Sequence, residues 1–352
     1  MTDSPSDLRV APLRIAMVAP PWLEIPPVAY GGIEPVVAGL VDSLVARGHE
    51  VTLVASGEAR TTAQRTVTIF EKPPSNRIGE ALPEVIGAAV AARAIADLEV
   101  DLVHDHSLAG PLLAWGRRAP TVVTAHGPVT GESGQYYALM SDTVKLIAIS
   151  ESQRTSAPEV HFAGRVYNGI DVASFTVEEH KQDYVAWIGR FTPDKGPDEA
   201  IRAARALGLR IILAGKCSEP AEFEYYESVV KPLLGPDAEF VGEVDATSKR
   251  ALMEGAQCLV FPLQWDEPFG VVMVESMACG TPVAAFARGS VPEVVADGVS
   301  GAVVPVGSDF TLAVKRAIGL DPWACRRHVE ERFDLEFMAR GYERVYLEAL
   351  GR

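Results

Sequence analysis

Two carboxylates, Glu267 and Glu275, lie eight positions apart in the segment EPFGVVMVE. This segment follows CLVFPL, which is typical of a buried strand, so Glu267 falls in a loop and Glu275 in the helix that the loop enters. Carboxylates in these places could be an acid/base pair that cleaves a sugar, ligands of a metal ion, or acceptors for the hydroxyl groups of a ligand.

The spacing of the two glutamates best fits a role as acceptors for the hydroxyl groups of a ligand. The carboxylates of a glycosidase usually face each other across a cleft from separate elements, and a magnesium site needs further oxygen ligands nearby. The backbone N–H groups of Phe269, Gly270 and Val271 would begin the helix without partners, aimed at the ligand. We therefore expect one carboxylate to accept hydrogen bonds from a sugar and the other from a ribose.

Two cations follow an earlier strand in YVAWIGRFTPDKG, with Arg190 just past the strand and Lys195 just before a helix. A guanidinium and an ammonium from one loop suit a diphosphate, although a solvated charged loop is the usual explanation for such residues. Open α/β sheets bind ligands at the carboxyl ends of their strands, so the position of this loop favours the diphosphate.

The N-terminal half places glycines and histidines at equivalent positions. Gly31 and Gly32 close a proline-rich loop where a helix begins, which suits phosphate binding but equally an ordinary tight turn. His104 and His106 end the strand DLVHDH, and the aspartate between them points the other way. We therefore expect each to hydrogen-bond a loop instead of binding a metal. His126, which a glycine follows, is the better candidate for ligand binding.

The elements that must position these residues alternate between short β-branched strands and helices, which indicates parallel sheets covered on both sides. One series runs from RIAMVAP to KLIAIS and a second from YVAWIGR to PVAAF, so we expect two α/β sheets joined near residues 168–182. Within the second series, residues 220–233 are expected to form one helix. The tail FDLEFMARGYERVYLEALGR should form an amphipathic final helix.

Composition narrows the class of protein. The 352 residues carry a formal net charge of −15, and both halves are acidic, which disfavours binding to nucleic acid or to an anionic membrane. The four cysteines are too widely spaced for a zinc site or a disulfide framework, and no apolar run is long enough to span a bilayer. The N-terminus has no pattern of a secretion signal, so we expect a cytoplasmic protein.

The motifs together resemble glycosyltransferase family 4, retaining transferases of the α/β GT-B fold that carry an E-x7-E motif. Similar segments occur along nearly the whole chain: RIAMVAPPW, YGGIE, SLVARGHEVTLVAS, DLVHDHS, AHG, YNGID, WIGRFTPDKG, FVGEVDATSKRALMEGA and the tail. The resemblance implies two Rossmann-like domains facing across a cleft, with acceptor binding at residues 1–172 and nucleotide-sugar binding at residues 173–330. Residues 331–352 would form a helix that crosses back to the first domain.

By this resemblance, Arg190 and Lys195 would hold the diphosphate of a nucleotide sugar, and Gly32, beside Gly31, would close on it. Family members need no metal and retain the anomeric configuration of the donor. The two cations would then neutralise the leaving diphosphate, which could accept the proton of an acceptor that attacks from the same face.

The resemblance also implies roles for the carboxylates. Glu275 would bind the ribose hydroxyls of the donor. Glu267 and the N–H groups of residues 269–271 would bind the donor sugar, which His126 would approach from the N-terminal domain.

The base of the nucleotide is harder to assign. Asp245 and Lys249, in FVGEVDATSK, could recognise guanine, which favours GDP-mannose as the donor. Asp245 could equally cap the next helix, and UDP-glucose therefore stays open.

The N-terminal loops are expected to bind the acceptor. They carry four aromatic residues able to stack on a sugar: Trp22, Tyr30, Tyr136 and Tyr137. A saccharide or glycosylated small molecule is therefore the expected acceptor. A nucleotide-sugar hydrolase or epimerase of the same fold is the alternative enzyme. A non-catalytic sugar-binding module is disfavoured because the full phosphate and sugar set is present.

Overall fold

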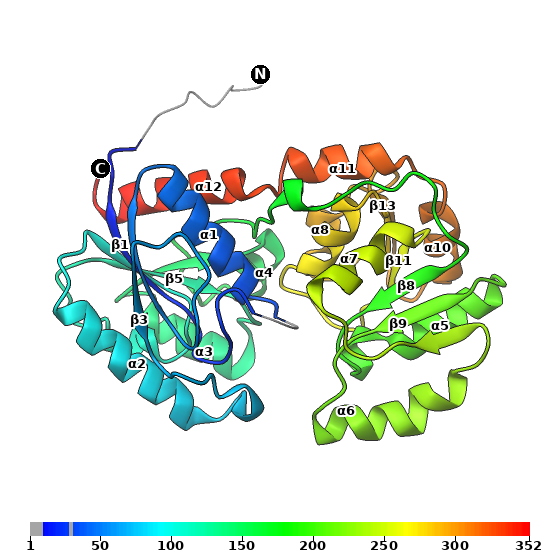
Figure 1. The fold of residues 1–352 in the computed structure, drawn as a ribbon, viewed down its shortest axis with the longest axis horizontal. Helices are drawn as coiled ribbons and strands as arrows, with labels where there is room; N and C mark the ends of the chain where they lie inside the picture. The colour runs from blue at the N-terminus through cyan, green and yellow to red at the C-terminus, as the bar shows by residue number, and fades with distance from the viewer. Residues whose placement is uncertain (1–9, 28–30) are drawn as a thin grey trace.

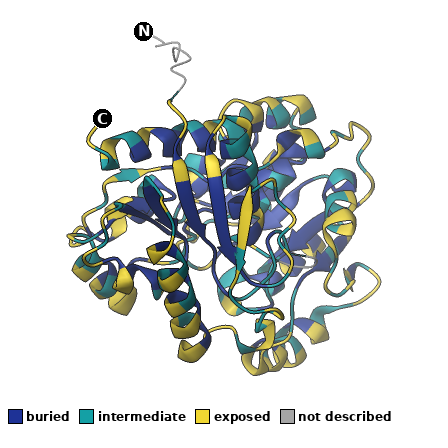
Figure 2. Cartoon of the chain, turned by 60° about the vertical axis from the view of Figure 1, so that its left-hand side comes forward, coloured by how far each residue is buried: buried dark blue, intermediate teal, exposed yellow. Residues whose placement is uncertain are grey.

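The computed structural model describes residues 10–27 and 31–352. Two α/β domains stand side by side, one from each half of the chain, and the last helix returns to the first domain (Figure 1). Most strands are buried, the edge strand at residues 65–68 is largely exposed, and the helices expose their outer faces (Figure 2). The predicted architecture of two Rossmann-like domains with a helix that crosses back is confirmed. No helix within the described residues has the length and apolar character that crossing a membrane requires.

The N-terminal domain contains seven parallel strands in the order β3-β2-β1-β4-β5-β6-β7. The order reverses direction between β1 and β4, so the loops after these strands diverge and leave room for a ligand. The strands are β1 (Arg14–Val18), β2 (Glu50–Ala55), β3 (Arg65–Thr68), β4 (Leu102–Asp105), β5 (Thr121–Ala125), β6 (Lys145–Ala148) and β7 (Gly164–Arg165). The helices are α1 (Glu34–Ala46), α2 (Ala81–Ala96), α3 (Gly131–Met140) and α4 (Glu151–Ser156), with short 3₁₀ turns η1 (Ser75–Arg77), η2 (Gly110–Leu113) and η3 (Val172–Ser174).

The C-terminal domain contains six parallel strands in the order β10-β9-β8-β11-β12-β13, which reverses between β8 and β11. The strands are β8 (Val185–Ile188), β9 (Ile211–Ala214), β10 (Ala238–Phe240), β11 (Leu259–Phe261), β12 (Val283–Phe286) and β13 (Gly301–Val304). The helices are α5 (Pro197–Ala206), α6 (Pro220–Tyr225), α7 (Ala246–Gly255), α8 (Val271–Ala278), α9 (Val291–Val294), α10 (Thr311–Ala317) and α11 (Pro322–Glu330). The last helix, α12 (Leu335–Ala349), follows them in the chain but packs on the N-terminal domain.

The single helix expected at residues 220–233 is wrong in detail. The chain changes its winding there from α6 to a π-helical turn η5 (Tyr226–Val230) and then to a 3₁₀ turn η6 (Lys231–Leu233). Pro232 lies in the last turn, and because proline has no N–H it cannot continue the α-helical hydrogen bonds. Another 3₁₀ turn, η4 (Pro193–Lys195), follows β8 and carries one of the candidate cations.

Helix α12 attaches the C-terminus to the N-terminal domain. Met338, Tyr342 and Tyr346 of its buried face join the apolar core that β1, β2 and α1 form. At the rim of this core, Arg47 and Glu343 form an ion pair of 2.7 Å. Helix α12 follows the C-terminal domain in the sequence but contributes core residues to the N-terminal domain.

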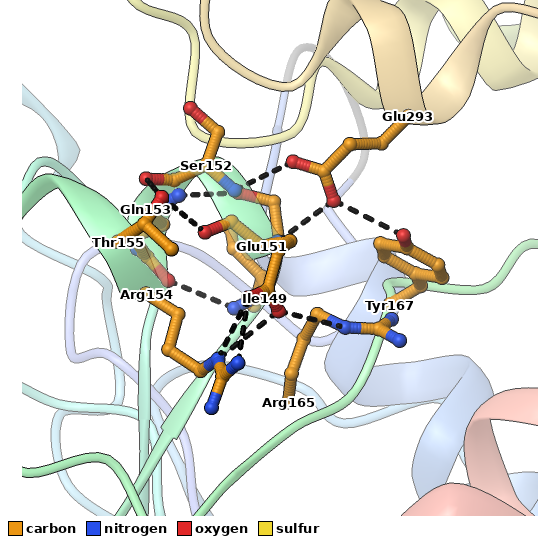
Figure 3. A network of polar contacts seen from close by, with 10 residues as sticks. Ile149, Glu151, Ser152, Gln153, Arg154, Thr155, Arg165, Tyr167 and Glu293 are labelled. Atoms are coloured by element: carbon orange, nitrogen blue, oxygen red, sulfur yellow. Dashed lines mark hydrogen bonds and ion pairs between the residues drawn. The ribbon is translucent and has the colours of Figure 1, made fainter.

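A carboxylate joins the two domains near the sheet ends. Glu293 of α9, in the C-terminal domain, accepts hydrogen bonds from the N–H groups of Glu151 and Ser152 at the start of α4, at 2.7 and 2.6 Å (Figure 3). It also accepts a hydrogen bond of 3.0 Å from the hydroxyl of Tyr167. A negative charge at a helix N-terminus is stabilising, so this contact helps to fix how the domains meet.

Candidate functional site

A pocket of about 190 Å³ lies between the two domains, at the carboxyl ends of both sheets. One wall comes from loops of the N-terminal domain and the start of α1, and the other from the loops after β8 and β11, from α7 and from the start of α8. Eleven of the residues expected to bind or act on the donor line it: Gly31, Gly32, His126, Arg190, Lys195, Lys249, Glu267, Phe269, Gly270, Val271 and Glu275. The structure thus brings these residues together, while their individual roles remain predictions.

Arg190 enters the pocket from the end of β8. Its Nε atom lies 3.0 Å from Oε1 of Glu222, whose side chain is 1% exposed, while 43% of the Arg190 side chain is exposed. The buried carboxylate therefore holds the guanidinium by charge, without a hydrogen bond to its Oε1 atom, and the guanidinium fork remains partly accessible. A fork held in this way suits the oxygens of a phosphate.

Each glutamate of the E-x7-E motif forms an ion pair that its spacing did not indicate. Lys195 Nζ contacts Glu267 Oε2 and lies 4.6 Å from the centroid of the Trp265 ring. Lys249 Nζ lies 2.7 Å from Glu275 Oε1. Within the part of the chain that the structure describes, the second oxygen of each carboxylate accepts no hydrogen bond. Those oxygens are available to the hydroxyl groups of a ligand.

Backbone contacts fix the loop that carries Glu267. Gly289 has a φ of +52°, and a Cβ atom there would lie 2.4 Å from the nitrogen and 2.5 Å from the oxygen of the Glu267 backbone. Ser290 donates from its N–H to the carbonyl of Glu267 and from its hydroxyl to the carbonyl of Phe269, both at 2.9 Å. Gly270, with a φ of +75°, then turns the chain into α8. A turn after β12 therefore holds the carboxylate in place.

The wall from the N-terminal domain is uncharged. His126 Nε2 lies 2.8 Å from His106 Nδ1, and burial lowers the pKa of His126 to about 3, so this imidazole is neutral near pH 7. His104 lies 2.8 Å from both the Thr124 and the Tyr346 hydroxyls. His104 and His106 are buried as the structural interpretation expected, but these partners lie on β5 and α12 instead of on loops. Among the described residues no group of three potential metal ligands occurs.

Asp245 does not line the pocket. It is the N-cap of α7, and its side chain accepts a hydrogen bond of 2.7 Å from the N–H of Ser248, which is the capping alternative left open by the sequence. This hydrogen bond is also the main cause that holds the pKa of the Asp245 carboxyl below its usual range. Its predicted contact with a base stays a prediction, whereas its structural use is observed.

Of the aromatic residues expected to bind the acceptor, Trp22, Tyr136 and Tyr137 do not line the pocket. Tyr137 of α3 packs in the domain core and is 8% exposed, which disfavours stacking on a sugar. The hydroxyl of Tyr136 donates to the carbonyl of Leu108, and Trp22 is half-buried in the loop after β1. Tyr30 lies outside the described residues. Tyr136 and Tyr137 are neighbours on α3 and Trp22 lies in a loop, so these three side chains point to different places.

Asn168 also lines the pocket, although nothing in the sequence marks it except its place in the segment YNGID. It is 5% exposed, and its Oδ1 atom has no hydrogen-bond partner among the described residues. An unpaired buried carbonyl costs about 1–3 kcal/mol, so a hydrogen-bond donor on a ligand would relieve it. An asparagine before a glycine is common in turns, and its pattern alone therefore signals no binding role.

A second hollow, of about 100 Å³, also reaches Glu267. Thr130, Ser152 and Ser156 of the N-terminal domain face Asp266 and Glu267 of the C-terminal domain across it. No lysine or arginine occurs among the described residues that line it. Ser152 and Ser156 lie on the short helix α4 and Thr130 just before α3, and none of them has a distinctive spacing in the sequence, so only the arrangement of the two domains reveals this hollow.

Known proteins share both the sequence families and the fold. A family model described as Glycosyltransferase Family 4 matches residues 30–174, and one described as Glycosyl transferases group 1 matches residues 173–321. The phosphatidyl-myo-inositol mannosyltransferase of Mycolicibacterium smegmatis is 28% identical over 95% of this chain and 89% of its own. The glycogen synthase of Mycobacterium tuberculosis is 27% identical over 96% of this chain and 95% of its own. A solved glycosyltransferase involved in avilamycin A biosynthesis has a TM-score of 0.74 and 26% identity, over 97% of this chain and 98% of that chain.

Proposed function

The chain belongs to glycosyltransferase family 4 and has the GT-B fold, and we propose that it is a retaining enzyme that moves a hexose from a nucleotide-diphosphate sugar to a saccharide or glycosylated small molecule. One observation carries this proposal. Arg190 and the ion pairs Lys195–Glu267 and Lys249–Glu275 line one pocket, opposite an uncharged wall. Three cations beside two carboxylates suit a ligand that has both phosphates and hydroxyl groups.

The cations are proposed to replace a metal ion. As the bond between the anomeric carbon and the diphosphate oxygen breaks, negative charge grows on the diphosphate, and Arg190 and Lys195 stabilise it. The acceptor oxygen forms the new bond to the anomeric carbon from the same face. Its proton passes to an oxygen of the leaving diphosphate, so the configuration is retained and no protein nucleophile is needed.

The carboxylates are proposed to hold the two ends of the donor. Glu275 accepts hydrogen bonds from the ribose hydroxyls, and Glu267 accepts them from the hexose. Binding of the hexose leaves Lys195 beside the diphosphate, because the Lys195 ammonium has three donors and Glu267 uses one of them. Asn168 Oδ1 and His126 offer further acceptors from the other wall.

GDP-mannose is the proposed donor, with UDP-glucose as its competitor. The similarity to a protein named mannosyltransferase supports mannose. Lys249 remains close enough to the pocket to meet a base carbonyl while it pairs with Glu275. The acceptor is proposed to be uncharged and to bind in the hollow between Thr130 and Asp266, because the described residues that line it include the carboxylates of Asp266 and Glu267 but no lysine or arginine to bind a phosphate.

A panel of nucleotide sugars tests the donor. GDP-mannose or UDP-glucose should raise the melting temperature, because a ligand that binds only the native state stabilises it. Release of nucleoside diphosphate should then depend on the acceptor and persist in chelator. Release that ignores every acceptor would favour the hydrolase, and a strict need for a divalent ion would contradict the proposed role of Arg190 and Lys195.

A further inference from the structure

Three side chains form a continuous line of contacts from the core of the N-terminal sheet to the pocket. Met17 lies on β1, His106 just past β4 and His126 just past β5, and these strands are neighbours in the sheet. His106 Nε2 lies 3.1 Å from Met17 Sδ, and His106 Nδ1 lies 2.8 Å from His126 Nε2. Each nitrogen in this line therefore faces a single neighbour whose chemistry limits where the protons are.

The thioether fixes the first proton. Methionine sulfur has no hydrogen to donate and acts only as a weak acceptor, so the contact with Met17 requires a proton on Nε2 of His106. Burial lowers the pKa of His106 well below its usual value and that of His126 to about 3, so each ring carries a single proton near pH 7. His106 Nδ1 is then a bare acceptor, and His126 must donate to it from Nε2.

The second nitrogen of His126 consequently has no proton. No described residue forms a hydrogen bond with His126 Nδ1, and this atom is not among the buried unpaired atoms, so it is open to the pocket that the ring lines. We propose that Met17 and His106 are positioning residues that lock His126 in the Nε2–H tautomer, so that His126 presents only a hydrogen-bond acceptor to the bound ligand.

The fixed tautomer of His126 limits which group of the donor substrate can contact it, and this part of the inference rests on the proposed function. A ligand group that meets His126 Nδ1 must itself donate a hydrogen bond, which a sugar hydroxyl does and a carboxylate, fluorine or phosphate oxygen does not. Replacement of that one hydroxyl by fluorine should weaken donor binding by about tenfold to a hundredfold, because an acceptor then faces an acceptor. In His126→Ala the same fluorinated donor and its parent should bind within about threefold of each other.

Nuclear magnetic resonance tests the lock without any ligand. In protein labelled with ¹⁵N at histidine, two-bond ¹H–¹⁵N correlations distinguish a ring protonated at Nε2 from one protonated at Nδ1. At pH 7 the wild type should show His106 and His126 both in the Nε2–H form. A His126 ring protonated at Nδ1 would overturn the proposal.

Met17→Leu tests the origin of the lock, since it removes the sulfur acceptor and keeps a similar volume. The Nε2–H populations of His106 and His126 should both fall. Met253→Leu, a buried methionine of the C-terminal domain, is the matched control and should leave the spectrum of both rings unchanged. An unchanged His126 tautomer in Met17→Leu would show that Met17 does not determine the protonation of His106 and His126.

The two kinds of failure are distinguishable. If no nucleotide sugar raises the melting temperature, the proposed function fails, while the tautomers are still measured in the free protein. If the donor binds and none of its monofluorinated forms loses affinity through His126, the substrate part of this inference is wrong and the proposed function stands.

Discussion

The two walls of the pocket differ in charge. All five charged residues among those described as lining it belong to the C-terminal domain: Arg190, Lys195, Lys249, Glu267 and Glu275. The N-terminal wall offers glycines, apolar side chains, Asn168 and a neutral His126. The charge that we propose binds a nucleotide sugar is therefore assembled within one domain, while the other wall is proposed to recognise shape and hydrogen-bond direction.

Because one wall is charged and the other neutral, different interactions stabilise the two walls. The charged wall balances cations and carboxylates in pairs, which lowers the cost of holding them partly out of water. The neutral wall depends on burial, which keeps the histidines unprotonated and their hydrogen bonds directional. Changes that remove charge should therefore affect catalysis most, and changes on the neutral side should appear as pH-dependent stability.

Loss of either cation should have the largest effect. Lys195→Ala and Arg190→Ala should each lower turnover by roughly two to three orders of magnitude, because each removes one group that stabilises the leaving diphosphate. Lys315→Ala, an exposed lysine on α10, is the control and should leave turnover unchanged. Near-normal turnover in both pocket variants would show that Arg190 and Lys195 do not bind the diphosphate.

Acid should destabilise the neutral wall. The folded-state pKa values of His104, His106 and His126 lie below the unfolded value near 6.5 because burial disfavours the charged form. The unfolded chain then binds more protons, so their stabilisation is complete above pH 6.5 and is lost as the pH falls toward the folded values. Well below pH 6.5, each histidine should contribute up to about 1.4 kcal/mol per pH unit to the free energy of unfolding.

Denaturant unfolding between pH 6.5 and 5 measures this slope. His104→Asn should reduce this slope by the contribution of one histidine, about 1 kcal/mol per pH unit over this range, while the exposed His161→Asn should preserve it. Equal slopes in wild type and His104→Asn would mean that the buried ring titrates like a free one.

The turn behind Glu267 should be sensitive to a single methyl group. Gly289→Ala should lower the free energy of unfolding by about 2 kcal/mol or more and also reduce transfer, because its Cβ meets the Glu267 backbone. Gly298→Ala is matched to it, since Gly298 also has a positive φ of +77° but its Cβ would have nothing within 4 Å. That variant should cost about 1 kcal/mol and leave transfer intact. Equal losses of transfer activity in Gly289→Ala and Gly298→Ala would show that Gly289 does not support the position of Glu267.

The contact between the domains should give the smallest effect. Glu293→Gln removes the charge at the start of α4 and one of two acceptor oxygens, so it should cost about 1 kcal/mol of stability. Glu348→Gln, on the exposed face of α12, should cost nothing measurable. Thermal unfolding compares the two, and identical melting temperatures would show that Glu293 does not stabilise the assembled domains.

Much of this arrangement could be predicted from the sequence because parallel strands and their loops are local features. Strand periodicity placed Arg190 and Glu267 at the ends of their strands, and the parallel topology brought those ends to one edge. The ion pairs Lys195–Glu267 and Lys249–Glu275 could not be predicted, because rotamers and distances between separate loops decide them.

The N-terminal wall was harder to predict. Tyr137 has a side chain that suits sugar stacking, but the rotation of α3 directs it into the core. Asn168 and Ser152 carry no pattern of their own and reach the cleft only when the domains are placed together. Asp245 could either bind a base or cap a helix. The structure shows the helix cap, which needs only a neighbouring N–H group of the same chain segment.

Nucleotide titration tests most directly whether the two glutamates divide the donor between them. In calorimetric titrations with GDP and UDP, Glu275→Ala should weaken binding of the preferred nucleotide by about tenfold, because the ribose is present in donor and product alike. Glu267→Ala should bind that nucleotide within about twofold of wild type and lose transfer instead, because its partner is the hexose. Equal nucleotide affinity in wild type and Glu275→Ala would contradict the account.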